Sequence, residues 1–186
     1  MAEGKKILPK SQEMFNKEVF NLKNLNESKR TEKPSQQTSY YDYEFFVDGS
    51  CAVHSDRHMI AACVCNKEVS DGRETNKVWI DDIGRGTNNI AEYRAVYLAV
   101  RLSPPNSKIL IKSDSALVLN QLQGYWRIYD PSLYKWYKRI KNVIKRKHLK
   151  VEFEKIEGHN PLKPNPADKA IQEYLKSKRL DSLFKG

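Results

Sequence analysis

The 186-residue chain lacks any long apolar segment. None of its hydrophobic runs approaches the roughly 20 residues that a helix needs to cross a bilayer, so the sequence predicts no membrane span. The N-terminal stretch MAEGKKILPKSQEMF has no apolar core of the kind that signal peptides carry, and Glu3 and Glu13 argue against a mitochondrial transit peptide. We therefore expect a cytoplasmic protein with no membrane partner.

Cysteine is also scarce, with Cys51, Cys63 and Cys65 as its three occurrences. An odd and sparse count does not indicate a disulfide framework, and no second Cys/His pair stands at a spacing suited to zinc. Cys63 and Cys65 stand two residues apart in an apolar stretch, so we expect them on one face of a strand as core thiols. This usage favours a reducing compartment.

Acidic residues are too few to balance the basic ones: 33 Lys and Arg oppose 23 Asp and Glu, for a net charge of +10. Such a balance favours a polyanionic partner, either nucleic acid or an anionic membrane surface, although a solvated basic face is the plainer alternative. The charge is uneven. Residues 121–155 hold ten basic and three acidic residues, whereas residues 41–120 hold nine basic and eleven acidic residues.

The chain divides into a polar extension over residues 1–40, which we expect to be mostly disordered, and a domain over residues 41–186. Alternating and apolar runs predict strands over residues 41–49, 59–66, 77–83, 108–113 and 150–156. Helical spacing predicts helices over residues 90–102, 117–123, 131–143 and 166–175, the last with Asn165 as its N-cap. The order β-β-β-α-β-α-α-β-α predicts an α/β layered domain whose mixed sheet has an antiparallel side and a parallel side.

Four acidic residues stand where an apolar residue or a turn would be expected. Asp48 follows the apolar run FFV, Asp114 ends the strand ILIKS, Glu92 lies in an apolar helix, and Asp168 opens the last helix. Buried carboxylates are costly without partners, and a divalent cation such as Mg²⁺ relieves their mutual repulsion. Each also has a plainer explanation, as a turn residue, a surface helix residue or a partner of the helix dipole.

Four short segments give this pattern a specific resemblance. VDGS, TNNIAE, SDS and the late G-H-N followed by N-P-A-D resemble the ribonuclease HI family in sequence, order and separation. The likeness covers about residues 43–178. It implies the ribonuclease H-like fold, with a five-stranded mixed sheet of three antiparallel strands and then parallel strands, flanked by helices.

The resemblance also implies an activity: endonucleolytic cleavage of the RNA strand of an RNA–DNA hybrid, leaving a 5′-phosphate and a 3′-hydroxyl. It assigns Asp48, Glu92, Asp114 and Asp168 as catalytic, metal-binding carboxylates for two Mg²⁺ ions about 4 Å apart, with Mn²⁺ as a possible substitute. His159 matches the family's mobile-loop histidine, which is thought to aid proton transfer or product release. An exposed loop histidine is the alternative.

For substrate contacts, the resemblance implies that the residues before the catalytic glutamate read the 2′-hydroxyls of the RNA strand. They are Thr87, Asn88 and Asn89, for which helix capping is the alternative. Residues beside the acids, Ser50, Cys51 and Ser115, are further candidates for backbone contacts. Trp126 and Arg127 are candidates for the DNA strand, against the alternative of a solvated basic helix. We expect the chain to act as a monomer.

The sequence also departs from the family. AVHSDRHM replaces the glycine-rich turn that many members have after DGSC, and GYWRIYDPSLY leaves little room for a basic protrusion between the middle helices. Nothing in residues 1–40 resembles the hybrid-binding module of some members. Two other functions stay open: another nuclease of the same fold, which would usually begin with an acid-x-acid strand, and a non-catalytic nucleic-acid-binding domain.

Overall fold

The computed structural model describes residues 41–51, 58–68, 77–158, 162 and 164–183. Its elements are β1 (Tyr43–Cys51), β2 (His58–Glu68), β3 (Lys77–Arg85), α2 (Asn88–Leu102), β4 (Lys108–Ser113), α3 (Ala116–Gln123), α4 (Pro131–Arg146), β5 (Lys150–Lys155) and α5 (Pro166–Leu183). This order confirms the predicted succession of strands and helices. The expected polar extension over residues 1–40 lies outside the described residues, as does the replacement loop over residues 52–57.

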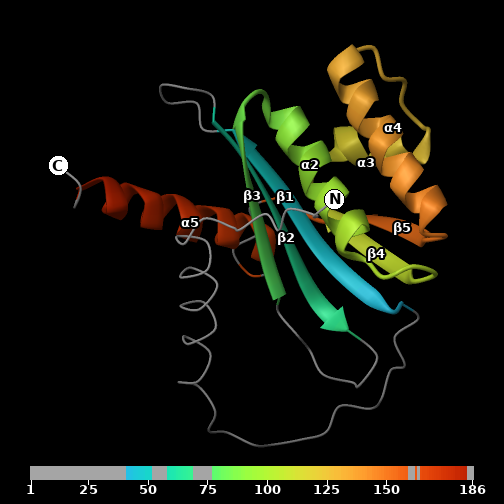
Figure 1. Cartoon of the computed structure of the whole chain (residues 1–186), viewed down its shortest axis with the longest axis horizontal. Coiled ribbons are helices and arrows are strands. Elements are labelled where there is room, and N and C mark those ends of the chain that lie inside the picture. Colours follow the sequence, from blue (N-terminus) through green and yellow to red (C-terminus); the bar gives the residue numbers. More distant parts are fainter. Residues whose placement is uncertain (1–40, 52–57, 69–76, 159–161, 163, 184–186) are drawn as a thin grey trace, which may run out of the picture. The chain divides into compact units, whose positions relative to one another are not determined.

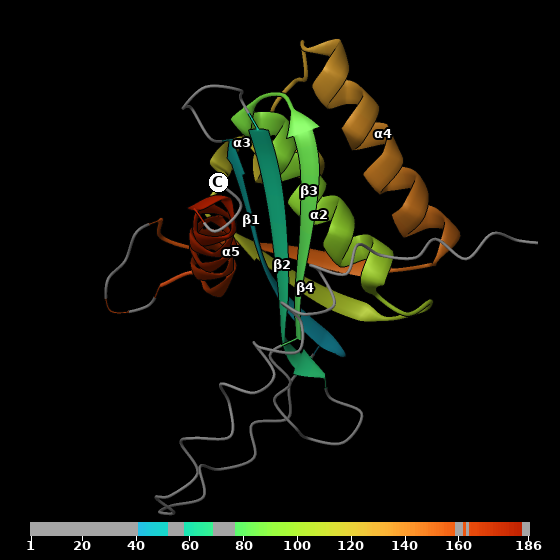
Figure 2. The same ribbon diagram turned by 60° about the vertical axis from the view of Figure 1, so that its left-hand side comes forward.

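The five strands form one mixed sheet in the order β3-β2-β1-β4-β5, as Figures 1 and 2 show. β2 pairs antiparallel with both β1 and β3, whereas β4 pairs parallel with both β1 and β5. The predicted mixed sheet is therefore confirmed. β3 extends beyond its apolar run to Arg85, because the pairing of His58 with Arg85 carries the β2–β3 ladder past it.

The parallel pairing of β1 with β4 decides which residues meet at the sheet edge. Its register sets Phe46 opposite Lys112. Asp48 and Asp114 each follow two residues later, so the same register carries both carboxylates to one end of neighbouring strands. The adjacency of these two strands therefore brings the two aspartates together.

Helices cover the sheet on both faces. In Figure 2, α5 lies on one side and α2 and α4 lie on the other, with α4 on the outer side of α2. Buried residues of β1, β2 and β4 face α2 in the main core, among them Val47, Cys63 and Ile111. Cys63 is thus a core thiol, as predicted, while the Cys65 side chain lies outside the described part of the chain. No helix among the described residues is both long enough and apolar enough for a membrane span.

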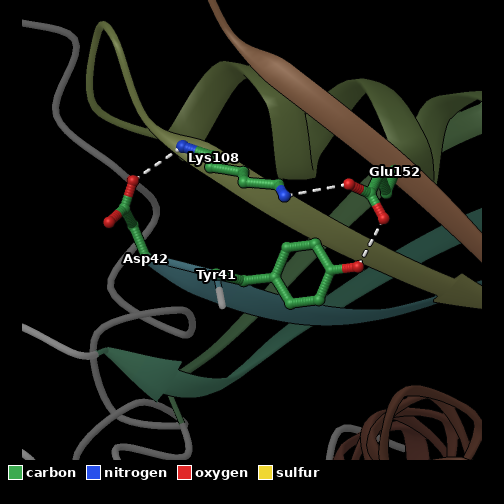
Figure 3. A network of polar contacts seen from close by, with 4 residues as sticks. All are labelled: Tyr41, Asp42, Lys108 and Glu152. Atoms are coloured by element: carbon green, nitrogen blue, oxygen red, sulfur yellow. Dashed lines mark hydrogen bonds and ion pairs between the residues drawn. The ribbon is translucent and has the colours of Figure 1, made fainter. Parts of the chain in front are cut away.

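A polar network fixes the far end of the parallel strands (Figure 3). The Tyr41 hydroxyl donates to Glu152 Oε2 at 2.5 Å, and Lys108 Nζ lies 3.0 Å from Glu152 Oε1. The backbone nitrogen of Lys108 donates to Asp42 Oδ2 at 2.7 Å. Because the Tyr41 hydroxyl donates to the Glu152 carboxylate, the pKa of Tyr41 is raised to about 12. The network joins the start of β1 to β4 and β5.

The connection between α3 and α4 is held by buried Gln121. The Tyr93 hydroxyl of α2 donates to Gln121 Oε1 at 2.8 Å, and Gln121 Nε2 donates to the backbone oxygen of Arg127 at 3.1 Å. Asp130 then caps α4 by accepting from the backbone nitrogen of Ser132, with Pro131 in the first turn. One buried amide therefore links α2, α3 and the segment that leads into α4.

Replacing Gln121 with leucine should lower the free energy of unfolding by about 1–3 kcal/mol, because it leaves the Tyr93 hydroxyl and the Arg127 carbonyl without their partner. Adding Tyr93→Phe to Gln121→Leu should recover part of that loss, since one unpaired group disappears. Urea denaturation measures both effects. Gln123→Leu, at an exposed neighbouring position, is the control and should cost less than about 0.5 kcal/mol. Equal losses for Gln121→Leu and Gln123→Leu would contradict the structural role of Gln121.

Candidate active site

Three carboxylates meet at the end of the sheet. Asp48 of β1, Glu92 of α2 and Asp114, which follows β4, each offer an oxygen, and these oxygens all lie within 4.8 Å of one another. Glu92 is buried, and the two aspartates are half-buried. The β1–β4 register supplies the aspartates, and the first turns of α2 supply the glutamate, so three separate elements build the cluster.

Gly49 allows α2 to come close enough for Glu92 to join the cluster. A Cβ on Gly49 would lie 2.1 Å from the backbone nitrogen of Glu92 and 2.2 Å from the carbonyl carbon of Ala91. Neither backbone atom can move aside without shifting the helix. The glycine of the DGS segment is thus required by the contact between β1 and α2, a role that the sequence pattern alone did not reveal.

The cluster is electrostatically strained. Burial raises the pKa of Glu92 to about 9, and the charges of Asp48 and Asp114 act in the same direction, while a backbone hydrogen bond from Gly49 acts against them. Glu92 Oε2 and Asp114 Oδ1 are buried and accept no hydrogen bond from the described part of the chain. Such unsatisfied oxygens are costly in a folded protein and need a partner of opposite polarity.

A hard divalent cation fits this set of donors. All three residues offer oxygen and none offers sulfur or nitrogen, which is the ligand chemistry of Mg²⁺ and Mn²⁺. A cation between the carboxylates would give a partner to the two unsatisfied oxygens and reverse the shift of the Glu92 pKa. The residues present therefore fit the metal that the sequence led us to expect.

Asp168 lies outside this group of three. It stands half-buried in the first turn of α5, where both of its carboxylate oxygens accept from Gln172 Nε2, at 3.2 and 3.1 Å. The start of α5 is nevertheless fixed to β1, because Asn165 Nδ2 donates to the backbone oxygen of Val47 at 3.3 Å. Asn165 Oδ1 also accepts from Ala167 N, the expected N-cap contact.

His159 lies outside the described residues, but the chain just before it passes close to the cluster. A Cβ on Gly158 would lie 2.7 Å from Asp114 Oδ2. The segment that leads to His159 therefore runs beside the carboxylates, and the absence of a side chain at residue 158 makes this approach possible.

The expected substrate-binding residues fall into two regions. Beside the cluster, Thr87 Oγ1 accepts from Ile90 N at 3.4 Å as the N-cap of α2, and Asn88 Oδ1 accepts from the backbone nitrogen of Cys51 at 2.8 Å. Asn89 is exposed, and Ser50 and Ser115 are half-buried. Trp126 and Arg127 are exposed in the α3–α4 connection. The capping role of Thr87 does not exclude a substrate contact.

The metal-free protein should lose stability as the pH rises, because the pKa of Glu92 in the folded state is raised from 4.5 to about 9. A raised pKa means that Glu92 stabilises the fold fully below pH 4.5 and that this contribution is lost as the pH rises toward 9. Glu92→Gln removes the titration. In EDTA, its advantage over the wild type should grow over that window, by at most about 1.4 kcal/mol per pH unit.

Thermal or urea unfolding across the pH range measures this difference. The exposed Glu173→Gln is the control, and its profile should run parallel to that of the wild type. If the Glu92→Gln profile also runs parallel to the wild type, Glu92 does not carry the strain that its burial implies. Adding Mg²⁺ should stabilise the wild type more than Glu92→Gln, since only the wild type keeps three carboxylates.

Comparisons with known proteins agree with this geometry. The chain is 43% identical over 75 residues to YpeP of Bacillus subtilis, a match that covers 38% of this chain and 33% of YpeP. It is 42% identical over 59 residues to the bifunctional protein Rv2228c of Mycobacterium tuberculosis, covering 30% of this chain and 16% of that protein. The chain thus matches a third or less of the length of these relatives.

Solved structures share the fold. The RNase H1 of the halophilic archaeon Halobacterium salinarum superposes with a TM-score of 0.56 at 23% identity, over 70% of this chain and 98% of the other. LC11-RNase H1, solved in complex with an RNA/DNA hybrid, gives a TM-score of 0.55 at 21% identity, over 68% and 91%. The family model for RNase H matches residues 41–175. The chain therefore belongs to the RNase H family.

Proposed function

We propose that the protein is an endonuclease that hydrolyses the RNA strand of RNA–DNA hybrids by a two-metal-ion mechanism. The observation that carries the proposal is the cluster of Asp48, Glu92 and Asp114, with two buried oxygens that lack a partner, on the fold of this family. The hybrid complex of LC11-RNase H1 supports the choice of substrate. The proposal covers the RNase H domain of the chain.

Asp48, Glu92 and Asp114 would hold the metal ions, Mg²⁺ or Mn²⁺, with Asp168 as a fourth ligand. When bound, the ions supply an activated water and stabilise the leaving 3′ oxygen. The water oxygen forms a bond to phosphorus, and the bond from phosphorus to the 3′ oxygen of the RNA breaks. The products are a 5′-phosphate and a 3′-hydroxyl. In this proposal, His159 aids proton transfer or product release.

The residues around the α2 N-terminus would recognise the RNA strand. Because Asn88 Oδ1 accepts from Cys51 N, its Nδ2 is left to donate to a substrate oxygen. Asn89 and Thr87 would join it in contacting 2′-hydroxyls, which are the groups that distinguish RNA from DNA. Ser50, Cys51 and Ser115 would contact the backbone near the scissile phosphate. Trp126 and Arg127 would contact the DNA strand from the α3–α4 connection.

With Mg²⁺ or Mn²⁺ present, the wild type should cleave the RNA of a labelled hybrid, and Asp114→Asn should lose at least about 100-fold in rate while still binding the hybrid. Gel electrophoresis of the labelled strand measures cleavage, and fluorescence anisotropy in EDTA measures binding. Glu154→Gln, an exposed change on β5, is the control and should cleave normally. Wild-type protein that leaves hybrids intact but degrades single-stranded DNA would contradict the proposal.

Asp168→Asn should raise the Mg²⁺ concentration needed for half-maximal cleavage and should lose less activity than Asp114→Asn, because Asp168 lies outside the clustered three. Gln172→Ala is the matched control. It removes the hydrogen bonds to Asp168 but keeps the carboxylate, so its Mg²⁺ requirement should stay at or below that of the wild type. A metal titration that leaves Asp168→Asn indistinguishable from the wild type would rule out Asp168 as a ligand.

A further inference from the structure

A group of exposed rings and cations lies on the α3–α4 connection and the outer side of α4. Tyr125, Tyr129 and Tyr134 are 72%, 84% and 45% exposed, which is unusual for large aromatic residues. The exposed cations that follow them along α4 are Lys135, Lys138, Arg139, Lys141, Lys145 and Arg146. We call these nine residues the aromatic–basic surface. Neither the carboxylate cluster nor its neighbouring substrate contacts include any of them.

The rings are presented by a well-fixed segment of chain. Gly124 ends α3 in the left-handed conformation, and the backbone nitrogens of Tyr125 and Trp126 both donate to the Asn120 carbonyl, at 2.8 and 3.2 Å. Gln121 holds the Arg127 carbonyl, as described above. Little conformational entropy remains to be lost when a ligand binds to such a segment, so the exposed rings form a prearranged binding platform.

Within the described part of the chain, the cations of α4 have no acidic partners. α4 contains no Asp or Glu, and within the described ranges none of its six exposed cations forms an ion pair. Several lie over rings instead: Lys138 Nζ is 4.8 Å from the Tyr134 ring centre, and Lys141 Nζ is 5.7 Å from that of Tyr137. Like charges four residues apart destabilise a helix by a few tenths of a kcal/mol per pair. An anionic ligand would remove this repulsion.

The chemistry of the surface selects among anionic partners. Leu133, Ile140 and Val143 place the apolar side of α4 in the protein core, so α4 has no free apolar face to insert into a lipid surface. A duplex keeps the faces of its bases stacked and away from the tyrosines. A single strand offers both phosphates for the cations and unpaired bases for the rings, which is how proteins commonly hold single-stranded nucleic acid.

We propose that the aromatic–basic surface binds a single-stranded nucleic-acid segment that flanks the hybrid. The proposal deepens the proposed function and rests on it for the origin of this segment. Tyr93, which follows Glu92 directly, connects through Gln121 to Arg127 at the base of the platform. α4 then continues along the outer side of α2 (Figures 1 and 2). A strand that left the carboxylates on this side would reach the α3–α4 connection, which carries Tyr125 and Tyr129, and then the cations of α4.

Anisotropy of a labelled single-stranded oligothymidylate of about 15 nucleotides, in EDTA, tests the surface without cleavage. The wild type should bind it. Tyr129→Ala/Tyr134→Ala and Lys138→Gln/Lys141→Gln should each weaken binding about tenfold or more. The lysine pair should also reduce the salt dependence of binding, by about 1.4 units of the log–log slope. Tyr129→Phe/Tyr134→Phe keeps the rings and should bind like the wild type.

The control for charge is Lys176→Gln/Lys178→Gln on α5, which removes the same charge from exposed positions, one of them also over a tyrosine ring. It should bind the oligonucleotide like the wild type. All variants should cleave a short blunt hybrid at the wild-type rate. The two α4-side variants, Tyr129→Ala/Tyr134→Ala and Lys138→Gln/Lys141→Gln, should cleave a hybrid with a single-stranded overhang less efficiently at low enzyme concentration. Thermal unfolding confirms that each variant is folded.

The outcomes separate the two proposals. If the α4 and α5 lysine variants bind the oligonucleotide equally, or if blunt-hybrid cleavage falls in parallel with single-strand binding, the surface is not a separate single-strand site. Binding of the wild type to anionic phospholipid vesicles but not to the oligonucleotide would also overturn it. If the wild type cleaves no hybrid but the α4-side variants lose single-strand binding, the proposed function fails and the single-strand site stands.

Discussion

The close contact between β1 and α2 at Gly49 is the constraint on which the rest of the site depends. The helix can bring Glu92 to the aspartates because the strand presents hydrogen atoms, and no Cβ, to the backbone of Ala91 and Glu92. Together with the parallel register of β1 and β4, this contact concentrates three carboxylates where water is partly excluded. The fold thus places mutually repelling carboxylates at one end of its sheet, and a divalent cation bound between them would relieve that repulsion.

The acidic and the basic residues of the domain are arranged in different ways. Asp48 of β1, Glu92 of α2 and Asp114, which follows β4, converge on one point, whereas the basic residues of α4 spread over an outer surface with no acidic neighbour on that helix. In the proposed function, the first arrangement holds metal cations and the second binds a polyanionic nucleic acid. The buried Gln121 bridge keeps them in a fixed relation, because it connects the helix of Glu92 to the segment that leads into α4.

Much of this architecture was predictable from the sequence, for reasons that particular residues make clear. The alternation around Val47 and the apolar run before Asp114 predicted strands, and the order of elements predicted a mixed sheet. The pairing of β1 with β4 is known from the structure. The helix around Glu92 was predicted from its apolar spacing. The spacing of apolar residues indicates which face of a helix or strand is buried, but not which residues that face contacts. The strand contact of Asn165 and the bridge made by Gln121 are side-chain contacts between distant segments, so periodicity carried no sign of them.

Asp168 is a further case in which the sequence pattern did not reveal a side-chain contact. Asp168 lies in the first turn of α5, where Gln172, one turn later, binds its carboxylate, and a sequence motif does not reveal such local competition. The most direct test of the central claim is anomalous diffraction from crystals of the protein soaked in Mn²⁺. The account predicts an anomalous peak bounded by the carboxylates of Asp48, Glu92 and Asp114. Ordered Mn²⁺ bound elsewhere, with no peak among these three residues, would contradict it.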